Sequence, residues 1–396
     1  MKTKLLFLIV VAGLLATVAT AGTWTYNAAN GTLAHSETAW VLVVTPAGTG
    51  LTVTGISDQP HTRASLPLVD EVGGGYTITA IGDEAFSECY GLGMLTIPNS
   101  VTTIGSNAFS ICLDLTSVTL GNSVTTLGEQ AFAYCRDLTS VTIPNSVTTI
   151  GNKAFFMCLS LTAAALPESV TTIGEGAFCN CAKLTALSVS EKSLTFKSID
   201  GVLFDITGTR LIQYPAGKTG AYIISDTTTT IGTSAFQGCW GLASVIIPDS
   251  VTTIDDWAFA YCTSLISVTL PDSVTNIGCF AFSDCNYLTS VMFGSSVANI
   301  GVCAFNACVG LTNVILPDSV TTLGAQIFIS CPKLTGVTFK GKYPKAADKF
   351  LFYYESPSVT SYVTSEHAES WEPHLDSGSF EDDTAVWCGR PIRVVR

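Results

Sequence analysis

The sequence predicts an α/β repeat solenoid: a right-handed coil with a parallel sheet, short helical turns on the other face and β-rich terminal caps. The first observation is a unit of 23 residues that recurs ten times, as in VTTIGNKAFFMCLSLTAAALPES from Val147 to Ser169. The second is that the apolar spacing changes within each unit from a helical to a strand pattern. Because a fixed period of this length is typical of solenoids, each unit should bury its apolar face only against its neighbours.

The repeated unit has two parts and reads V-x-x-I-G-x-x-A-F-x-x-C-x-x-L-x-x-V-x-L-P-x-S. The A-F-x-x-C-x-x-L part suits one or two turns of helix with a single apolar face. We expect the Gly before it to turn the chain into this helical arm, although Asp255 replaces it in one repeat. The L-x-x-V-x-L part ends in β-formers and is usually closed by Pro, so it predicts a short strand. Strands one period apart should stack as a parallel sheet.

A known family shows the same pattern. L-x-x-V-x-L with a Cys three residues before its first Leu follows the leucine-rich-repeat signature. The longer phrase IG-x-x-AF-x-x-C-x-x-L-x-x-V-x-LP-x-SV resembles the BspA-like leucine-rich-repeat proteins, which are secreted or surface proteins of bacteria and some protists. The resemblance covers roughly residues 76–340. It implies a non-catalytic binding function, with adhesion to a host or extracellular-matrix protein.

The segments around the repeats predict export and capping. Residues 1–21 have the Lys residues, apolar run and A-x-A site of a signal peptide, so we expect the mature chain to be secreted or at the cell surface, without membrane insertion. Residues 22–75 predict an N-terminal β cap of two or three short strands, because an exposed solenoid end would leave an open sheet edge. Repeats one to five then occupy residues 76–189.

The period is interrupted once. Cys181 and Cys239 are 58 residues apart, which is 35 more than one period, and the intervening sequence contains GVLFD and RLIQYP around a turn. We expect residues 190–227 to form a β-hairpin insertion that bulges from the array as a flap. Repeats six to ten follow at 228–340, and residues 341–396 resemble the C-terminal caps of the BspA-like family.

Ten of the fourteen cysteines occupy one repeat position. A position filled identically in every coil should point inward, so we interpret these cysteines as a ladder of small buried apolar side chains. The alternative is disulfide pairing between adjacent coils, and Cys279 with Cys303 is the pair outside the ladder that we would test. The ladder consists of Cys89, Cys112, Cys135, Cys158, Cys181, Cys239, Cys262, Cys285, Cys308 and Cys331.

Charge and residue inventory exclude several functions. The net charge of −13 argues against nucleic acid and against anionic lipid as partners. All four histidines (His35, His61, His367 and His374) lie outside the repeats, so the array alone cannot supply a Ser-His-Asp or Cys-His site. No zinc-type Cys or His spacing occurs. We therefore expect no enzyme activity, no cofactor and no metal.

The array does offer a surface. In L-x-x-V-x-L, the residue between the last two apolar positions should face away from the core. We expect an extracellular or surface protein to bind a monomer of this chain along that face. The alternatives are a structural or cell-envelope spacer without a specific ligand, and a carbohydrate-associated accessory protein. The candidate binding residues are Thr96, Thr119, Thr142, Ile246, Thr269, Met292, Ile315 and Thr338.

Overall fold

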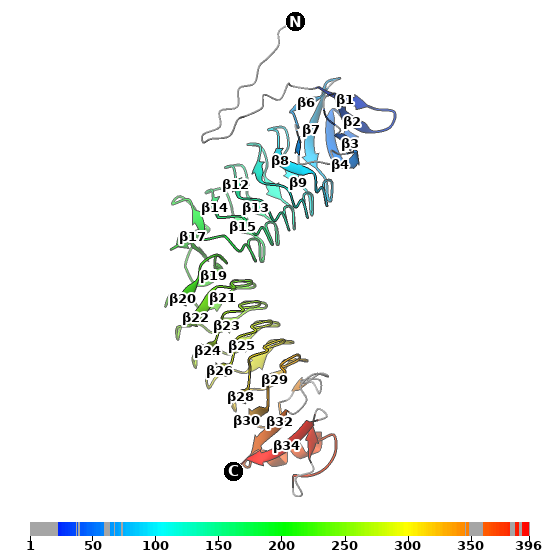
Figure 1. Cartoon of the computed structure of the whole chain (residues 1–396). Coiled ribbons are helices and arrows are strands. Elements are labelled where there is room, and N and C mark those ends of the chain that lie inside the picture. The colour runs from blue at the N-terminus through cyan, green and yellow to red at the C-terminus, as the bar shows by residue number, and fades with distance from the viewer. Residues whose placement is uncertain are drawn as a thin grey trace.

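The coils of the repeat stack into one elongated, curved array (Figure 1). The computed structural model describes residues 23–36, 38, 40–58, 64–66, 68–72, 74–344, 346–347, 359–380, 385–387 and 390–395. The predicted signal peptide, His61 and Cys388 lie outside these residues. The predicted repeat solenoid with a parallel sheet is confirmed.

The first half of the array contains two parallel ladders of strands. The ladder that the sequence predicts comprises β8 (Leu92–Thr96), β10 (Ser117–Thr119), β12 (Ser140–Thr142), β14 (Ala163–Leu166) and β16 (Ala186–Val189). The second ladder, formed by the V-x-x-I segment, was not predicted and comprises β7 (Tyr76–Ile81), β9 (Thr103–Ile104), β11 (Thr126–Leu127), β13 (Thr149–Ile150) and β15 (Thr172–Ile173). Most strands of this ladder are two residues long, which is too short for a strand pattern in the sequence.

The second half repeats this arrangement. One ladder comprises β20 (Gly220–Ile223), β22 (Leu242–Ile246), β24 (Ser267–Thr269), β26 (Ser290–Met292), β28 (Asn313–Leu316) and β30 (Gly336–Phe339). The other comprises β21 (Thr230–Ile231), β23 (Thr253–Ile254), β25 (Asn276–Ile277), β27 (Asn299–Ile300), β29 (Thr322–Leu323) and β31 (Ala346–Ala347). Register advances by one period, so that Thr269 pairs with Met292 and Ile315 with Thr338.

The segment between the ladders, expected as a short helical arm, consists of consecutive hydrogen-bonded turns. Two residues of each such segment have positive φ, for example Glu84 at 56° and Glu88 at 59°. This conformation interrupts an α-helix. It directs the N–H groups of Glu84, Phe86 and Glu88 to carbonyls of the next coil at 2.7–2.8 Å. The turns therefore form a third hydrogen-bonded face of the coil, and the helices of the described chain lie only in its C-terminal part.

The glycine that recurs in the repeat is explained by the stacking of coils and not by a turn. Gly151 has no positive φ, and a Cβ added to it would lie 2.6 Å from the carbonyl carbon of Gly128 in the preceding coil. Adjacent coils are therefore in backbone contact at this position. Asp255 takes the same position, and its carboxylate reaches out to the guanidinium of Arg210 at 2.7 Å.

The core consists of side chains repeated once per coil. The phenylalanine rings of the first half stack from Phe86 to Phe178 with centroids 5.0–5.5 Å apart. A second stack begins at Tyr214 and continues through Phe236. Each of these buried aromatic side chains contributes on the order of 1.5–3 kcal/mol of transfer free energy. The core is therefore built from nearest-neighbour contacts between coils.

The hairpin insertion separates two cores. Its strands are β17 (Phe196–Ile199), β18 (Val202–Asp205) and β19 (Arg210–Gln213), paired antiparallel. Because strand side chains alternate, Leu203 packs in the core of the first half while Val202 and Phe204 pack in the core of the second. The expected flap is thus wrong: the hairpin is buried between the two halves of the array, at the bend visible in Figure 1.

Both ends of the array are covered by additional strands. The N-terminal region holds six described strands where two or three were expected: β1 (Trp24–Asn27), β2 (Thr32–His35), β3 (Val41–Ala47), β4 (Gly50–Asp58), β5 (Ala64–Leu66) and β6 (Glu71–Val72). Strand β4 pairs with β7 and β5 pairs with β8, so each ladder of the first half is extended by this region.

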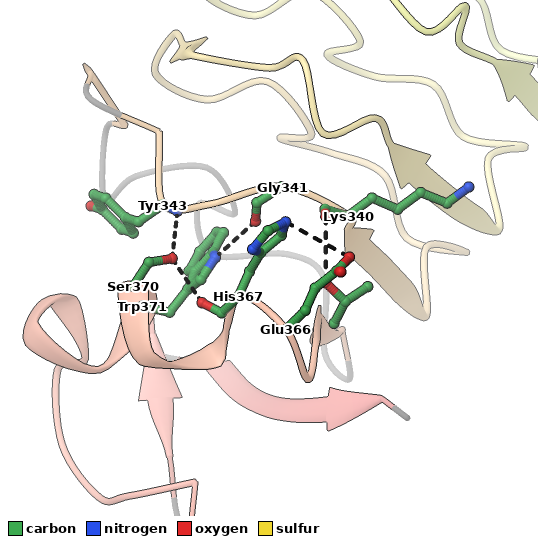
Figure 2. Close-up of polar contacts among 8 residues, drawn as sticks. Lys340, Gly341, Tyr343, Glu366, His367, Ser370 and Trp371 are labelled. Carbon is green, nitrogen blue, oxygen red and sulfur yellow. Dashed lines mark hydrogen bonds and ion pairs between the residues drawn. The ribbon is translucent and has the colours of Figure 1, made fainter.

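At the other end, β32 (Thr360–Thr364) pairs with β30 and is followed by α1 (Ala368–Trp371), the 3-10 helix η1 (Glu372–His374), β33 (Val386–Trp387) and β34 (Arg390–Val395). Figure 2 shows how α1 is tied to the last coil. The indole N–H of Trp371 donates to the carbonyl of Gly341 at 3.2 Å, and the Ser370 hydroxyl accepts from the N–H of Tyr343 at 3.1 Å. The buried Trp371 closes the open core at this end.

Candidate binding surface

The residues predicted to face outward form one row along each half of the array. Thr119 is in register with Thr96 on one side and with Thr142 on the other, and all three are exposed. In the second half Ile246, Thr269, Met292 and Ile315 are exposed, while Thr338 is half-buried. The structure thus places the eight candidate residues on one side of the array, in two rows divided by the hairpin.

The two rows differ in chemistry. Ala165 and Ser188 continue the row of threonines in the first half. In the second half the exposed fractions are 58% for Ile246, 65% for Met292 and 52% for Ile315. Because exposed apolar side chains that gather on one face often mark a contact surface, the second row is the stronger candidate.

Two further apolar residues belong to this face and were missed by the sequence reasoning. Ile223 of β20 pairs in register with Ile246 and is 66% exposed. Ile266 directly precedes β24 and is also exposed. The sequence of Gly220–Ile223 does not alternate between polar and apolar residues, and the segment was assigned to the insertion. We call Ile223, Ile246, Ile266, Met292 and Ile315 the apolar face.

Much of the threonine content has a structural role instead. The hydroxyl of Thr139 donates to the carbonyl of Thr116 at 3.1 Å, and that of Thr162 donates to Thr139 at 3.5 Å. A second series runs beside the short strands, where Thr125 donates to Thr102 and Thr148 to Thr125. These side chains join successive coils, so the abundance of Thr alone is not a sign of binding.

The ten ladder cysteines are all buried. From Cys112 onward, each thiol of an uninterrupted coil donates a weak hydrogen bond to the carbonyl of the Phe in the preceding coil, as Cys135 does to Phe109 at 3.1 Å. Burial raises the pKa of the Cys112 and Cys158 thiols well above the usual range. These two thiols are therefore protonated and unreactive.

None of the thirteen cysteines within the described residues is in a disulfide bond. Cys279 is half-buried and Cys303 is buried. Burial and, next, the neighbouring Cys279 raise the pKa of the Cys303 thiol. Both cysteines of the pair singled out for a disulfide test are therefore free thiols in this structure.

The described residues hold no group of three or more His, Cys, Asp or Glu side chains arranged to bind a metal ion. The three histidines in that part of the chain lie in the terminal regions. His35 packs on Trp24, His374 stacks on Tyr343 with ring centroids 3.6 Å apart, and His367 lies 3.8 Å from Glu366. These contacts give the histidines packing roles at the two ends of the array. Among the described residues, no helix has the length and apolarity needed to cross a membrane.

A stack of short coils with ladders of Cys and Phe inside and a long sheet face outside defines a leucine-rich-repeat protein. A family model described as BspA type leucine-rich repeat region matches residues 76–206 and 220–360. The chain belongs to this family, as the sequence pattern predicted. Leucine-rich-repeat proteins of this kind are typically non-enzymatic scaffolds for protein–protein interaction.

Several solved structures are similar. A leucine-rich repeat protein from Eubacterium ventriosum is 26% identical, with a TM-score of 0.61 over 81% of this chain and 86% of that one. A leucine-rich cell surface protein from Faecalibacterium prausnitzii is 26% identical, with a TM-score of 0.51 over 85% and 96%. The pneumococcal vaccine antigen PcpA is 21% identical, with a TM-score of 0.60 over 95% and 99%, and shows the shared fold alone. No curated protein matches this chain.

Proposed function

We propose that the chain is a secreted or cell-surface binding protein that holds an extracellular protein against the apolar face of its second half. The observation that carries the proposal is the gathering of Ile223, Ile246, Met292 and Ile315 on one exposed row, with Ile266 beside it. Their strands span roughly 20 Å at the usual spacing of about 4.8 Å. Exposed Met and Ile side chains in such a row suit the apolar centre of a protein interface.

In this proposal residues 1–21 act as a signal peptide for export, and the mature chain begins at residue 22. The mature chain binds its partner as a monomer. The cell-surface protein from Faecalibacterium prausnitzii supports a surface location for a relative of this fold. Adhesion is the form of binding that best suits an exported repeat scaffold. The net charge of −13 favours a partner with a basic surface around its apolar contact.

The test is a capture experiment with residues 22–396 as bait and purified extracellular-matrix and surface proteins as prey. The apolar-face variant carries Ile246→Ser, Met292→Ser and Ile315→Ser, which removes three of the five side chains of the apolar face. A matched control carries Thr96→Ala, Thr119→Ala and Thr142→Ala on the equivalent row of the first half. We expect the native chain and the control to bind the same partner, and the apolar-face variant to lose it.

Binding that survives in the apolar-face variant would contradict the proposal. If the native chain captures no purified protein, a spacer role without a specific ligand becomes the better account. If the native chain captures only glycosylated prey, the carbohydrate-associated alternative is favoured.

A further inference from the structure

A row of exposed carboxylates borders the apolar face along one edge. In four of the five coils that form this face, an aspartate stands three positions after the outward residue, in the turn that follows the strand. Three residues of extended chain span at most about 10 Å, so each carboxylate lies beside the outward row. Ser295 takes this place after Met292. We call the four exposed residues the aspartate row: Asp226, Asp249, Asp272 and Asp318.

The chain itself does not neutralise the aspartate row. Residues 219–332 contain seven aspartates and no Glu, Lys, Arg or His. Of these seven, Asp255 pairs with Arg210 at 2.7 Å, while no described cation forms an ion pair with the aspartate row. One carboxylate oxygen of Asp272 accepts the N–H of Ser295 at 2.7 Å, which leaves the other oxygen for a partner. The row therefore presents uncompensated negative charge to the solvent.

The first half shows that this charge is not needed for stacking. Where its outward row is threonine, the residue three positions later is Asn, and Glu occurs there only in the two coils next to the hairpin. Asn99 accepts the N–H of Asn122 at 2.8 Å, in the same way as Asp272 accepts that of Ser295. The contact between coils thus requires a side-chain oxygen and not a carboxylate. The apolar residues and the aspartates occur together in the second half.

The opposite edge of the apolar face is uncharged. Tyr287, directly before the buried Leu288, is 69% exposed, and Val309 is exposed one coil later. The surface is therefore apolar at one edge and acidic at the other. A partner that covers it buries apolar side chains in the middle and brings cations to a single flank.

The spacing of the outward row indicates which kind of segment fits. Neighbouring strands are about 4.8 Å apart, so the row offers one side chain about every 4.8 Å. An amphipathic α-helix presents an apolar side chain about once per turn of roughly 5.4 Å, a mismatch of only about 0.6 Å per coil. An extended segment presents one about every 6.7 Å on the same face and loses register after two coils. A helix that runs along the array, across the strands, matches the row better.

We propose that the apolar face binds a cationic amphipathic helix of the partner protein. The apolar stripe of this helix lies on Ile246, Met292 and Ile315, and its Lys or Arg side chains face the aspartate row. A helix of about 13 residues covers the roughly 19 Å from Ile223 to Ile315. The inference rests on the proposed function, because it requires the apolar face to be a binding surface, and it adds the charge and secondary structure of the partner.

A peptide tests the occupant. The probe is a fluorescein-labelled peptide of about 18 residues, five helical turns, with Leu along one stripe and Lys beside that stripe. We expect saturable binding to residues 22–396, a gain of peptide helicity in circular dichroism, and an affinity that falls as salt rises from about 50 to about 500 mM. A peptide with Glu in place of Lys should bind at least about tenfold more weakly. Absence of saturable binding, equal binding of the Glu peptide, or binding without a gain of helicity would each overturn the proposal.

A charge variant tests the aspartate row. It carries the residue that the first half uses at this position: Asp226→Asn, Asp249→Asn, Asp272→Asn and Asp318→Asn. The matched control removes four exposed charges from turns of the first half: Asp83→Asn, Glu84→Gln, Glu129→Gln and Glu175→Gln. We expect the Lys peptide to bind about tenfold more weakly to the aspartate-row variant and to change by less than about twofold in the control. An equal loss in both variants would overturn the proposal, because net charge and not the row would then attract the peptide.

The apolar-face variant separates this inference from the proposed function. If the Lys peptide binds the apolar-face variant as tightly as the native chain, the apolar face is not the site and both proposals fail. If the apolar-face variant loses the peptide while the aspartate-row variant binds it as tightly as the native chain, the apolar face remains a binding surface and only the cationic helix is overturned.

Discussion

The two halves of the array share their interior and differ on their outer face. Both halves stack one aromatic ring and one cysteine per coil, with the same register and the same turns. On the outward row, however, the first half presents Thr, Ala and Ser, whereas the second presents Ile246, Met292 and Ile315 beside two threonines. The comparison teaches that contacts between coils fix the interior, while the outward position is free to vary and can take on a binding role.

The largest expected effect on stability comes from variants in the two cores, and it tests whether the two halves unfold separately. Phe132→Ala in the first half and Phe259→Ala in the second should each destabilise the protein by about 3–5 kcal/mol, because each removes a fully buried ring from its stack. Since β18 and β19 separate the two cores, we expect each variant to lose hydrogen-exchange protection mainly in its own half. Equal loss of protection in both halves would show that the array unfolds as one unit.

A pH titration of stability tests the burial of cysteine thiols, which occurs in both halves. The pKa of the buried thiol is raised by burial to about 12 for Cys179 and Cys331, from an ordinary value of 9.0. The folded state therefore keeps these thiols protonated where the unfolded chain ionises them. Their contribution to stability is complete below about pH 9 and is lost as the pH rises toward about 12. We expect the urea concentration at the unfolding midpoint to decrease as the pH is raised from about 8 to about 10.5, and an unchanged midpoint would contradict the burial of Cys179 and of the ladder residue Cys331.

A smaller effect is expected from the left-handed turn positions at the junction and within the second half. Gly238 has a φ of 75°, and an added Cβ would lie 2.9 Å from the Cα of Asn180, so Gly238→Ala should destabilise by at least about 1–2 kcal/mol. Ala307 holds the same repeat position with a φ of 54°. Ala307→Gly relieves the strain and should be neutral or stabilising by about 1 kcal/mol. Thermal unfolding measures both effects: the unfolding temperature should drop in Gly238→Ala and should stay the same or rise in Ala307→Gly.

The smallest effect on stability belongs to the outer face. Because Ile246, Met292 and Ile315 are exposed, each change to Ser should alter the free energy of unfolding by no more than about 0.5 kcal/mol. Urea unfolding of the triple variant should therefore overlay that of the native chain, even where partner binding is lost. A large drop in the midpoint would mean that these side chains support the fold, and the capture experiment would then need single variants.

The sequence was sufficient for the features that recur in every coil. The 23-residue period, the strand in L-x-x-V-x-L and the inward Cys position follow from apolar spacing, since a side chain present in each unit must meet its own copy. The conformation of the turns was harder to predict from the sequence, because Tyr134 and Met157 adopt positive φ although neither residue type favours it. Their conformation is imposed by hydrogen bonds to the neighbouring coil, which no local pattern encodes.

The junction was the least predictable part. Ile212 and Ile223 both lie in the segment where the period is lost, so no alignment with other repeats could assign them a place. Only the register of β19 with β21 reveals that Ile212 holds a glycine position, and only the pairing of β20 with β22 places Ile223 on the apolar face. Both assignments depend on contacts between residues in different coils.

Strand β18 has a consequence for how such a chain can change in length. Because Leu203 closes one core and Phe204 opens the next, a coil gained or lost on one side leaves the packing on the other side untouched. Each half can therefore lengthen or shorten by whole 23-residue units through duplication or deletion. A lineage of such chains would be free to adjust the reach of the apolar face while the number of coils that separates it from the N-terminal end stays constant.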